Sequence, residues 1–414
     1  MSRRGLALGF CLTMLLAACR PADLRPAPVA APGAGAALAD AGRAADDGAV
    51  GAPGATPTDA GTATATAAAA GAGTADHSGQ APWHTGTQVF DHLAASFQAP
   101  ACIEGAHNQA WRKRYAGHPE RFAAQLERIL PLLAHVAAEL QARGLPAEYA
   151  LIPIVESWYR PEAVGPGGPA GLWQLMPATA RHHGVRIGAG YDGRFNPAEA
   201  TDAALAYLEA LNRRFDGDWR AVAMAYNAGE FRILRAFRAN GGRKVSGEER
   251  LPAGLAHTTY AYVAKLRALA CLIAEPERQG LVLPGEAHFT PLRRVDLPEP
   301  LHGLEQAAAW LGADARRLRS LNPAFRAGRP VPAGAGRALL VPDTATVRER
   351  LAAGPPDPST LPPAPAPRQH EIRPGDTLSA IAARYGVPLR QLYALNGLDA
   401  RSILRPGRLL QVDP

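Results

Sequence analysis

Lysine is scarce in this chain of 414 residues, because Lys113, Lys244 and Lys265 are the only ones. The formal net charge of +7 therefore comes almost wholly from arginine. No stretch interleaves basic residues with aromatic ones, so nucleic-acid binding is not expected. Two explanations of the charge stay open. One is a codon bias toward arginine on solvated faces, and the other is attraction to an anionic polymer or a membrane surface.

Long apolar runs are also missing. The run from Gly5 to Ala18 follows two arginines, is too short to span a membrane comfortably, and is typical of a signal-peptide core. It ends in LAAC, residues 16–19, which resembles a bacterial lipobox, and an ordinary cleavage site is the alternative. We expect cleavage before Cys19 and lipid on its thiol, with more than one acyl chain for stable anchoring. Arg20 follows the cysteine, which by resemblance to sorted lipoproteins favours the periplasmic side of the outer membrane.

Only four cysteines are present. Cys11 leaves with the signal and Cys19 takes the lipid, so Cys102 and Cys271 remain as an even pair in an oxidising compartment. They form either one disulfide or two buried thiols. No metal-ligand spacing appears, and His182-His183 is interpreted as a helix C-terminal pair. The sequence therefore predicts neither a metal nor a cofactor.

Composition divides the chain. Residues 21–88 contain almost no large apolar side chains and cannot bury enough surface to offset their ordering entropy. A second linker, "PPDPSTLPPAPAP", spans residues 355–367 and is stiffer. The predicted divisions are 1–18 signal peptide, 19–88 disordered Ala/Gly/Pro/Thr-rich tether, 89–284 main domain, 285–342 degenerate small module, 343–368 Pro-rich linker and 369–414 small terminal domain.

The main domain is predicted to be helical. Apolar residues recur at three- and four-residue steps between Pro119 and Gly144, with Pro131 inside the pattern expected to kink or split the helix. Asn196 caps a second helix that has proline in its first turn, and Asp218 caps a third. No sustained two-residue alternation occurs before about residue 280. The predicted fold class is mainly α, followed by small α+β modules.

One glutamate has an apolar setting. Glu156 lies in "IVESWYRPEAVGPGGPAGLWQLMP", residues 154–177, among isoleucine, valine and tryptophan. Such a site disfavours the ionised carboxylate, raises its pKa and suits a general acid. Glycosidic cleavage needs this acid, but ordinary hydrolases also need a second carboxylate. The nearest acids, Glu148 and Glu162, lack a comparable setting. The pattern therefore favours a reaction with one acid in which the substrate supplies its own nucleophile.

Four motifs occur in order: "VES", "GLWQLMP", "AYNAG" at residues 225–229 and "YVAKL" at residues 262–266. Together they resemble the lytic transglycosylases of the soluble-lytic-transglycosylase superfamily, which implies a goose-lysozyme-like catalytic domain. The arrangement with a terminal LysM domain resembles the membrane-bound lytic murein transglycosylase D type. The resemblance covers roughly residues 88–280 and residue 369 to the end.

The resemblance implies a reaction on the glycan strands of peptidoglycan. Glu156 protonates the β-1,4 oxygen between N-acetylmuramic acid and N-acetylglucosamine. It then takes the proton of the muramoyl C6 hydroxyl, which attacks C1 and leaves a 1,6-anhydro end without water. Ser157 orients the carboxylate or its helix end, and Gln174 binds sugar or acetamido groups. The remaining implied site residues are Met176 and Trp173 on the floor, Tyr226 and Asn227 beside the acid, and Tyr262 near the reacting ring.

Some of these residues have plainer interpretations. Trp173 and Met176 suit a core as well as a floor, Asn227 suits a helix stop, and Tyr260 rivals Tyr262 in the same stretch.

The chain departs from the family pattern at four positions. Gly165 stands in place of a serine, Pro169 in place of an alanine, Phe231 in place of a glycine and Thr258 in place of a glutamate. The first two leave open a peptidoglycan-binding lipoprotein that has lost turnover. Hydrolysis with lysozyme-like products is a third possibility, and it needs a second carboxylate that the sequence does not offer.

Residues 370–412 resemble a LysM domain, a βααβ unit that binds glycans containing N-acetylglucosamine. Asp376 or Thr377 can cap its first helix. The groove implied by the resemblance lies between the loops at 375–378 and 404–407. The candidate glycan-binding residues are Gly375, Asp376, Thr377, Leu378, Asn396, Leu404 and Pro406.

Residues 301–342 weakly repeat this unit, because "LEQAAAWLGADARRLRSLNPAF" parallels "LSAIAARYGVPLRQLYALNGL" and "ALLVP" parallels "LLQV". No Pro-Gly-Asp-Thr stretch precedes the first helix of this copy. We expect a packed module that binds glycan poorly.

Overall fold

The computed structural model describes residues 81–98, 102–103, 105–188, 191–242, 251–299, 301–325, 331, 336–363, 368–400 and 402–412. The predicted signal peptide, Cys19 and the predicted tether up to residue 80 lie outside the described residues. The predicted end of the tether at residue 88 is wrong, because Ala81 is buried in the core and a helix begins at Gly86. None of the described helices combines the length and the apolarity needed to cross a membrane.

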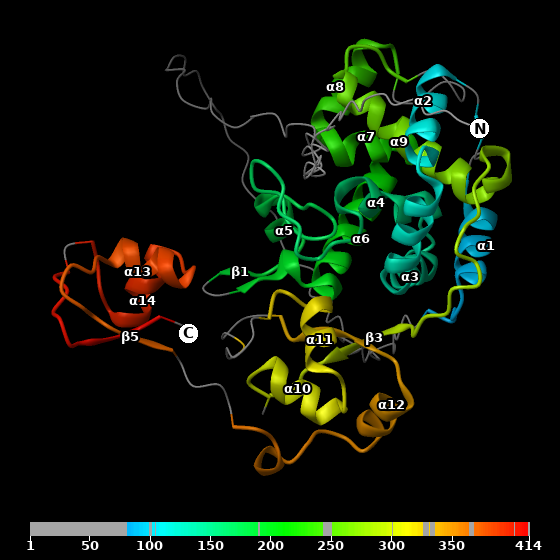
Figure 1. Cartoon of the computed structure of the whole chain (residues 1–414). Helices are drawn as coiled ribbons and strands as arrows, with labels where there is room; N and C mark the ends of the chain where they lie inside the picture. The colour runs from blue at the N-terminus through cyan, green and yellow to red at the C-terminus, as the bar shows by residue number, and fades with distance from the viewer. Residues whose placement is uncertain are drawn as a thin grey trace, which may run out of the picture.

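The main domain is built from helices, which confirms the mainly α class (Figure 1). Short 3-10 turns and one two-residue strand pair, β1 with β2, connect them. The helices are α1 (Gly86–Ser96), α2 (Ala106–Ala116), α3 (Pro119–Ala142), α4 (Ile152–Ser157), α5 (Pro177–His182), α6 (Pro197–Arg214), α7 (Trp219–Ala228), α8 (Glu230–Ala239) and α9 (His257–Ala274). The smaller elements are η1 (Ala147–Leu151), β1 (Ile187–Gly188), β2 (Tyr191–Asp192), η2 (Gly193–Phe195) and η3 (Pro276–Gln279).

Local signals set several helix boundaries. The Asn196 side chain accepts from the backbone N–H groups of Ala198 and Glu199, and Asp218 caps α7 in the same way, so both predicted caps are confirmed. Of the two effects predicted for Pro131, a kink or a split, the split does not occur, because α3 is one helix of 24 residues. Pro131 is itself buried, and the apolar packing on both sides of it outweighs the one backbone hydrogen bond that proline removes.

A disulfide joins Cys102 to Cys271, with Cα atoms 4.6 Å apart and a sequence separation of 169. Of the two states that the sequence left open, the structure contains the bridge. It ties the segment before α2 to the C-terminal part of α9, and α2 packs along α9. The bridge therefore holds two helices of the main domain together.

The first small module (residues 285–342) is a βααβ unit beneath the helical domain, drawn in yellow in Figure 1. Strands β3 (Leu292–Asp296) and β4 (Ala338–Pro342) pair antiparallel and enclose α10 (Leu304–Leu311) and α11 (Ala315–Leu321) in sequence. Helix α12 (Ala345–Ala352) follows. The module has its own core, yet Leu292, Leu321 and Leu340 belong to the core of the helical domain. We call the helical domain and this module together the body.

The second small module (residues 369–414) has the same order of elements. The turn η4 (Pro358–Thr360) precedes it. Strands β5 (Gln369–Glu371) and β6 (Leu409–Gln411) pair antiparallel, and α13 (Leu378–Tyr385) and α14 (Leu389–Asn396) lie between them in sequence. Its core is separate and includes Ile372, Ile381 and Leu410.

Candidate active site

Glu156 lies in the last turn of α4, where the chain reverses sharply. Trp158 and Tyr159 both adopt left-handed backbone conformations, with φ of 55° and 54°. Ser157 stabilises this reversal, because its hydroxyl donates to the carbonyl of Leu172 at 2.7 Å and accepts from the backbone N–H of Arg160 at 3.2 Å. Of the two roles suggested for Ser157, its hydrogen bonds match the one at the helix end.

The Glu156 carboxyl is half-buried and has one close partner. The Tyr262 hydroxyl, on α9, donates a hydrogen bond of 2.6 Å to Oε1. Burial raises the pKa of Glu156 to about 7, while this bond and the charge of Lys265 oppose the shift. A carboxyl with such a pKa holds its proton near neutral pH and can also give it up, as a general acid and base must.

Two backbone carbonyls fix the orientation of the Gln174 side-chain amide. Its Nε2 donates to the carbonyls of Gly171, at 2.8 Å, and Ala163, at 3.3 Å. Because both partners are acceptors, the nitrogen must face them, so Oε1 remains as an acceptor. Gly171 has a φ of 77°, and a Cβ there would overlap the carbonyl of Arg194, so this turn requires glycine.

Gly165 and Pro169, two departures from the family pattern, lie close to each other beside Gln174. A Cβ at Gly165 would lie 2.5 Å from Gln174 Oε1 and 2.7 Å from Pro169 Cγ. A serine at position 165 therefore does not fit unless the proline ring or the amide moves. The proline ring occupies space that a side chain at position 165 needs.

Trp173 and Met176 have different environments. The Trp173 side chain is fully buried, and its Nε1 donates to the hydroxyl of Thr201 at 3.0 Å, so it is a core residue. Met176 is 38% exposed, which leaves its thioether available at the surface.

Tyr226 and Asn227 lie at the end of α7. The Tyr226 hydroxyl donates to the carbonyl of Trp173 at 2.7 Å, which joins α7 to the Gln174 loop. Burial, with the charge of Glu156 as a smaller cause, raises the pKa of Tyr226 well above its usual value, so the hydroxyl stays protonated. Asn227 is half-buried in the last full turn before Gly229.

Tyr260, the alternative to Tyr262, and the two other nearby acids have different surroundings. The Tyr260 hydroxyl bonds to the carbonyl of Pro252 and the N–H of Leu255, closing the loop before α9. Glu148 is buried in η1 and accepts from the backbone N–H of Gln98 at 2.7 Å. Glu162 is exposed. Glu156 is thus the only one of the three acids that combines partial burial with a Tyr262 contact.

Sequence reasoning gave no site role to three side chains near this centre, Lys265, Tyr115 and Phe122. Lys265 lies one turn beyond Tyr262 on α9, and its charge acts on Glu156. Trp158 packs edge-on against Phe122 and Tyr115, with ring centroids 6.0 and 6.4 Å apart. The "YVAKL" motif contains Lys265, and helical spacing from Tyr262 was the signal that could have identified it.

The second module uses several of its candidate residues to build the fold. Thr377 caps α13 by accepting from the N–H of Ala380, whereas Asp376 accepts from Arg373 N–H and His370 Nε2, each at 2.8 Å. The capping question is thereby decided for Thr377. Gly375 has a φ of 88° at the exposed turn before them.

The other candidates of this module differ in exposure. The Asn396 amide bonds to the carbonyls of Leu392 and Gln411 and accepts from the N–H of Gln411, so its three bonds all go to backbone. Leu378 is buried and Leu404 packs against the module core, whereas Pro406 is exposed.

Sequence reasoning did not identify one apolar side chain next to Leu404. Ile403 is 85% exposed beside Leu404, in the loop that was expected to border the groove.

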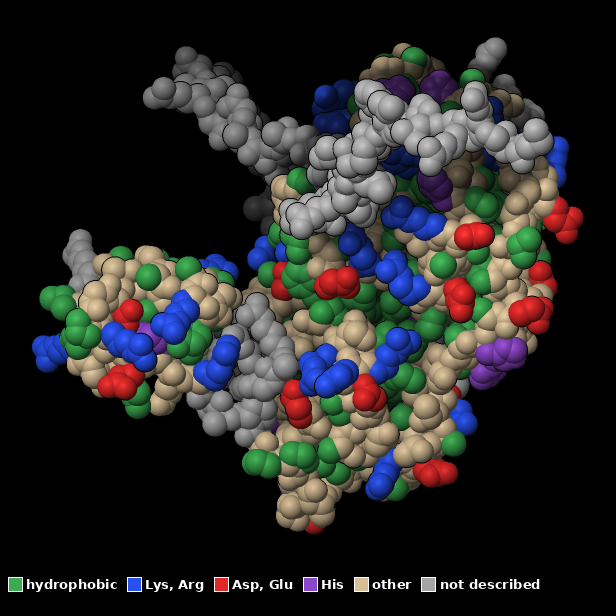
Figure 2. Space-filling model, in the orientation of Figure 1, with side chains coloured by type: hydrophobic (Ala, Val, Ile, Leu, Met, Phe, Trp, Pro, Cys, Tyr) green, Lys and Arg blue, Asp and Glu red, His purple; other side chains and the backbone are tan. Residues whose placement is uncertain are grey.

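No group of three or more His, Cys, Asp or Glu side chains suited to a metal ion occurs among the described residues. On the face shown in Figure 2, acidic and basic side chains are interspersed over the body. That distribution agrees with the solvated-face explanation of the net charge.

Comparisons with known proteins agree with the two motif-bearing regions. Residues 135–247 match the family described as Transglycosylase SLT domain, and residues 370–413 match the LysM domain family. The membrane-bound lytic murein transglycosylase D of Escherichia coli (strain K12) is 34% identical over 293 residues, which are 69% of this chain and 64% of that protein. The match thus spans slightly less than two thirds of the relative's length.

Two further similarities are shorter or weaker. The peptidoglycan transglycosylase gp16 of Escherichia phage T7 is 39% identical over 100 residues, 23% of this chain and 8% of that protein. The crystal structure of the 70 kDa soluble lytic transglycosylase of Escherichia coli aligns with 19% identity and a TM-score of 0.28, covering 47% of this chain and 43% of that one. That score is too low to support an argument about function. The motifs and the sequence matches together identify this chain as one that contains a transglycosylase SLT domain and a C-terminal LysM domain.

Proposed function

We propose that this protein is a lytic transglycosylase that cleaves the β-1,4 bond between N-acetylmuramic acid and N-acetylglucosamine in peptidoglycan. The observation that carries the proposal is the single half-buried carboxyl of Glu156, whose pKa is raised to about 7 and whose Oε1 accepts from Tyr262. The SLT match and the 34% identical relative agree with it.

In the proposed reaction, protonated Glu156 gives its proton to the glycosidic oxygen as the C1–O bond breaks. The muramoyl C6 hydroxyl then bonds to C1, and its proton returns to Glu156. Protons balance, and water is not consumed. Tyr262 holds the carboxylate between the two steps, because a hydrogen bond to the ionised form stabilises it. Gln174 Oε1 accepts from an acetamido N–H or a sugar hydroxyl, since its Nε2 is already bonded to Gly171 and Ala163.

The other parts of the chain bring the active site to its substrate. The second module binds N-acetylglucosamine-containing glycan through the loops at 375–378 and 404–407, which raises the local concentration of substrate. Lipid on Cys19 anchors the protein to the periplasmic leaflet of the outer membrane, and the segment before residue 81 lets the body reach the wall. Palmitate labelling of the wild-type protein, with loss of the label in Cys19→Ser, tests the anchor.

Product analysis tests the reaction. Purified sacculi are digested and the soluble muropeptides are weighed by mass spectrometry. We expect 1,6-anhydromuramoyl ends from the wild-type protein, none from Glu156→Gln, and unchanged products from Glu162→Gln, in which an exposed acid six residues further along the chain is changed. Reducing ends would mean hydrolysis instead, and absence of any release would mean a binding protein without turnover.

A further inference from the structure

Helix α2 presents one face that is both aromatic and basic. Its sequence, AHNQAWRKRYA, contains three Lys or Arg side chains and no acid. Asn108 and Arg112 are buried and bond to the carbonyl of Ile103, so they form the inner side. Arg114 is exposed, and Trp111 and Tyr115 are half-buried next to it, because residues three and four apart on a helix share a face.

This face borders the candidate active site. The Trp111 ring lies between two cations, with Arg114 Cζ 5.2 Å and Lys265 Nζ 4.8 Å from its centroid. Lys265 is on α9 one turn beyond Tyr262, the residue that bonds to Glu156. At the other end, the Tyr115 ring packs against Trp158, two residues after Glu156. The face therefore runs along the rim of the site.

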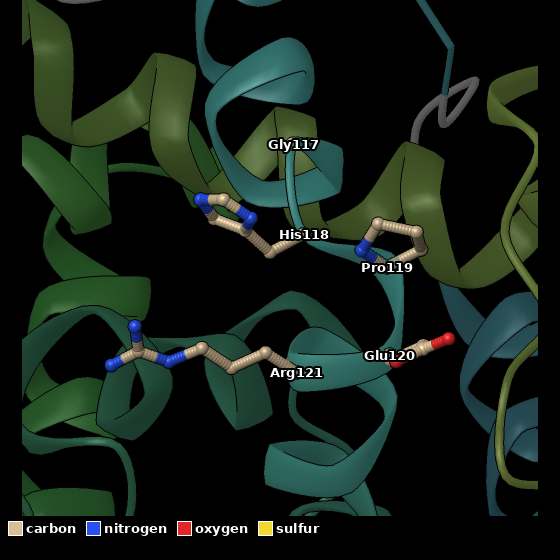
Figure 3. A pocket seen from close by; sticks show the side chains of 5 residues that line it. All are labelled: Gly117, His118, Pro119, Glu120 and Arg121. Carbon is tan, nitrogen blue, oxygen red and sulfur yellow. The ribbon is translucent and has the colours of Figure 1, made fainter. Parts of the chain in front are cut away.

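A cavity of about 390 Å³ continues the face where α2 meets α3. It is lined by residues 117–121, and Figure 3 shows the side chains of His118 and Arg121 pointing to the same side, with Glu120 pointing away. Both basic side chains are exposed. Within the described part of the chain no acidic side chain forms an ion pair with either of them.

We propose that this face, formed by Trp111, Arg114, Tyr115, His118 and Arg121, binds the peptide branch of the glycan strand through its carboxylates. The inference deepens the proposed function and rests on it for the identity of the substrate. The amidated sugar backbone of that substrate carries no charge, so its peptide carboxylates are the anions that it offers. An acid-free row of basic side chains beside aromatic rings complements such a branch in charge, and its guanidinium groups can bind carboxylates through two hydrogen bonds.

Direct binding tests the proposal independently of turnover. The full chain carrying Glu156→Gln is titrated at low salt with soluble glycan strands that keep their peptides, and with strands stripped of peptide by an amidase whose freed lactyl carboxyls are then converted to methylamides, so that the control strands carry no carboxylate. We expect the peptide-bearing strands to bind about fivefold more tightly, the effect of two exposed ion pairs. In Arg114→Gln/Arg121→Gln the ratio of the two dissociation constants should fall to about one. Arg350→Gln, which removes an exposed arginine in the last turn of α12, should keep the ratio.

The outcomes separate this proposal from the reaction. A ratio near one in the parent protein overturns it, as does a double variant that keeps the preference or that weakens binding to both strands equally. The glycan contribution of the second module is common to both strands and cancels in the ratio. Anhydro products from protein with Glu156 intact, together with a ratio of one, would leave the reaction standing and remove only the peptide subsite.

Discussion

The two small modules share one architecture and differ in what their outer faces contact. In the first, the Asn322 amide bonds to the backbone N–H and carbonyl of Leu340 and to the carbonyl of Leu318. In the second, Asn396 makes the same three bonds, to Gln411 and Leu392. Leu340 and Gln411 are thus equivalent positions of the last strand.

That equivalence explains why one module is fused and the other is separate. Leu340 is fully buried in the core of the helical domain, whereas Gln411 is only half-buried and polar. Opposite them in the strand pairs stand Arg294, which forms an ion pair with Asp202 of α6, and Gln369. Leu340 and the ion pair of Arg294, together with Leu292 and Leu321, therefore join the first module to the helical domain.

Exchanging the two equivalent residues should produce the largest effect. Leu340→Gln buries an amide without a partner and removes apolar packing, so we expect the body to lose about 3–5 kcal/mol of unfolding free energy. Gln411→Leu should change stability by less than about 0.5 kcal/mol. Denaturant titration followed by tryptophan fluorescence measures the body alone, because the second module contains no tryptophan. Equal small effects of the two changes would contradict the comparison.

Removing each asparagine should affect different parts of the molecule. Asn322→Ala leaves buried backbone groups of β4 unsatisfied, and we expect a loss of about 2 kcal/mol in the tryptophan-monitored transition. Asn396→Ala should cost about 1 kcal/mol, because Asn396 is only half-buried, and should shift only a separate calorimetric transition of the second module. A change of the tryptophan transition in Asn396→Ala would show that the second module is not independent.

Truncation after residue 363 removes the second module and keeps Leu361 and Pro362, which contact the body. We expect retention on sacculi to fall about tenfold, because a linked glycan-binding module raises the effective concentration of substrate. The cleavage rate on soluble glycan strands should stay at the full-chain value. The measurements are co-sedimentation with sacculi and product release from the soluble strands. A parallel loss of both would place the second module in the catalytic machinery.

The smallest effect concerns a polar pair that the first module lacks. His370 bonds to Asp376, and Val295 occupies the equivalent strand position in the first module. The backbone N–H of Arg373 and, secondly, His370 lower the pKa of Asp376. Such a carboxyl stabilises the folded module above its unfolded-state pKa, and this stability is lost as the pH falls through the lowered folded-state pKa.

Asp376→Asn should therefore lower the melting temperature of the second module by a few degrees at neutral pH. The difference from the wild-type protein should vanish in acid, where both side chains are neutral. Differential scanning calorimetry from pH 7 down to pH 3 checks this, and a difference that grew in acid would be inconsistent with a stabilising carboxylate.

Local signals in the sequence were enough for several helix starts and for the apolar setting of Glu156. The caps at Asn196 and Asp218 and the apolar setting of Glu156 each depend on neighbours within a few residues. The Tyr262 bond to Glu156 spans 106 residues, so only the family resemblance could suggest it.

The role of Leu340 could not be predicted from the sequence. "ALLVP" is a continuous apolar run that does not reveal which face meets a second core. In the sequence, Asn396 and Asp376 look like polar binding residues. In the structure, they form hydrogen bonds with backbone groups of the second module and, for Asp376, also with His370.

The pH dependence of cleavage tests the central claim most directly. The account assigns the first proton transfer to a Glu156 carboxyl whose pKa is raised to about 7. For soluble glycan strands, kcat/KM should be constant below that pH and should fall about tenfold per pH unit above it, because the proton donor is lost. A profile that stays flat to pH 9, or that already falls at the pH of an ordinary glutamate, would contradict the assignment.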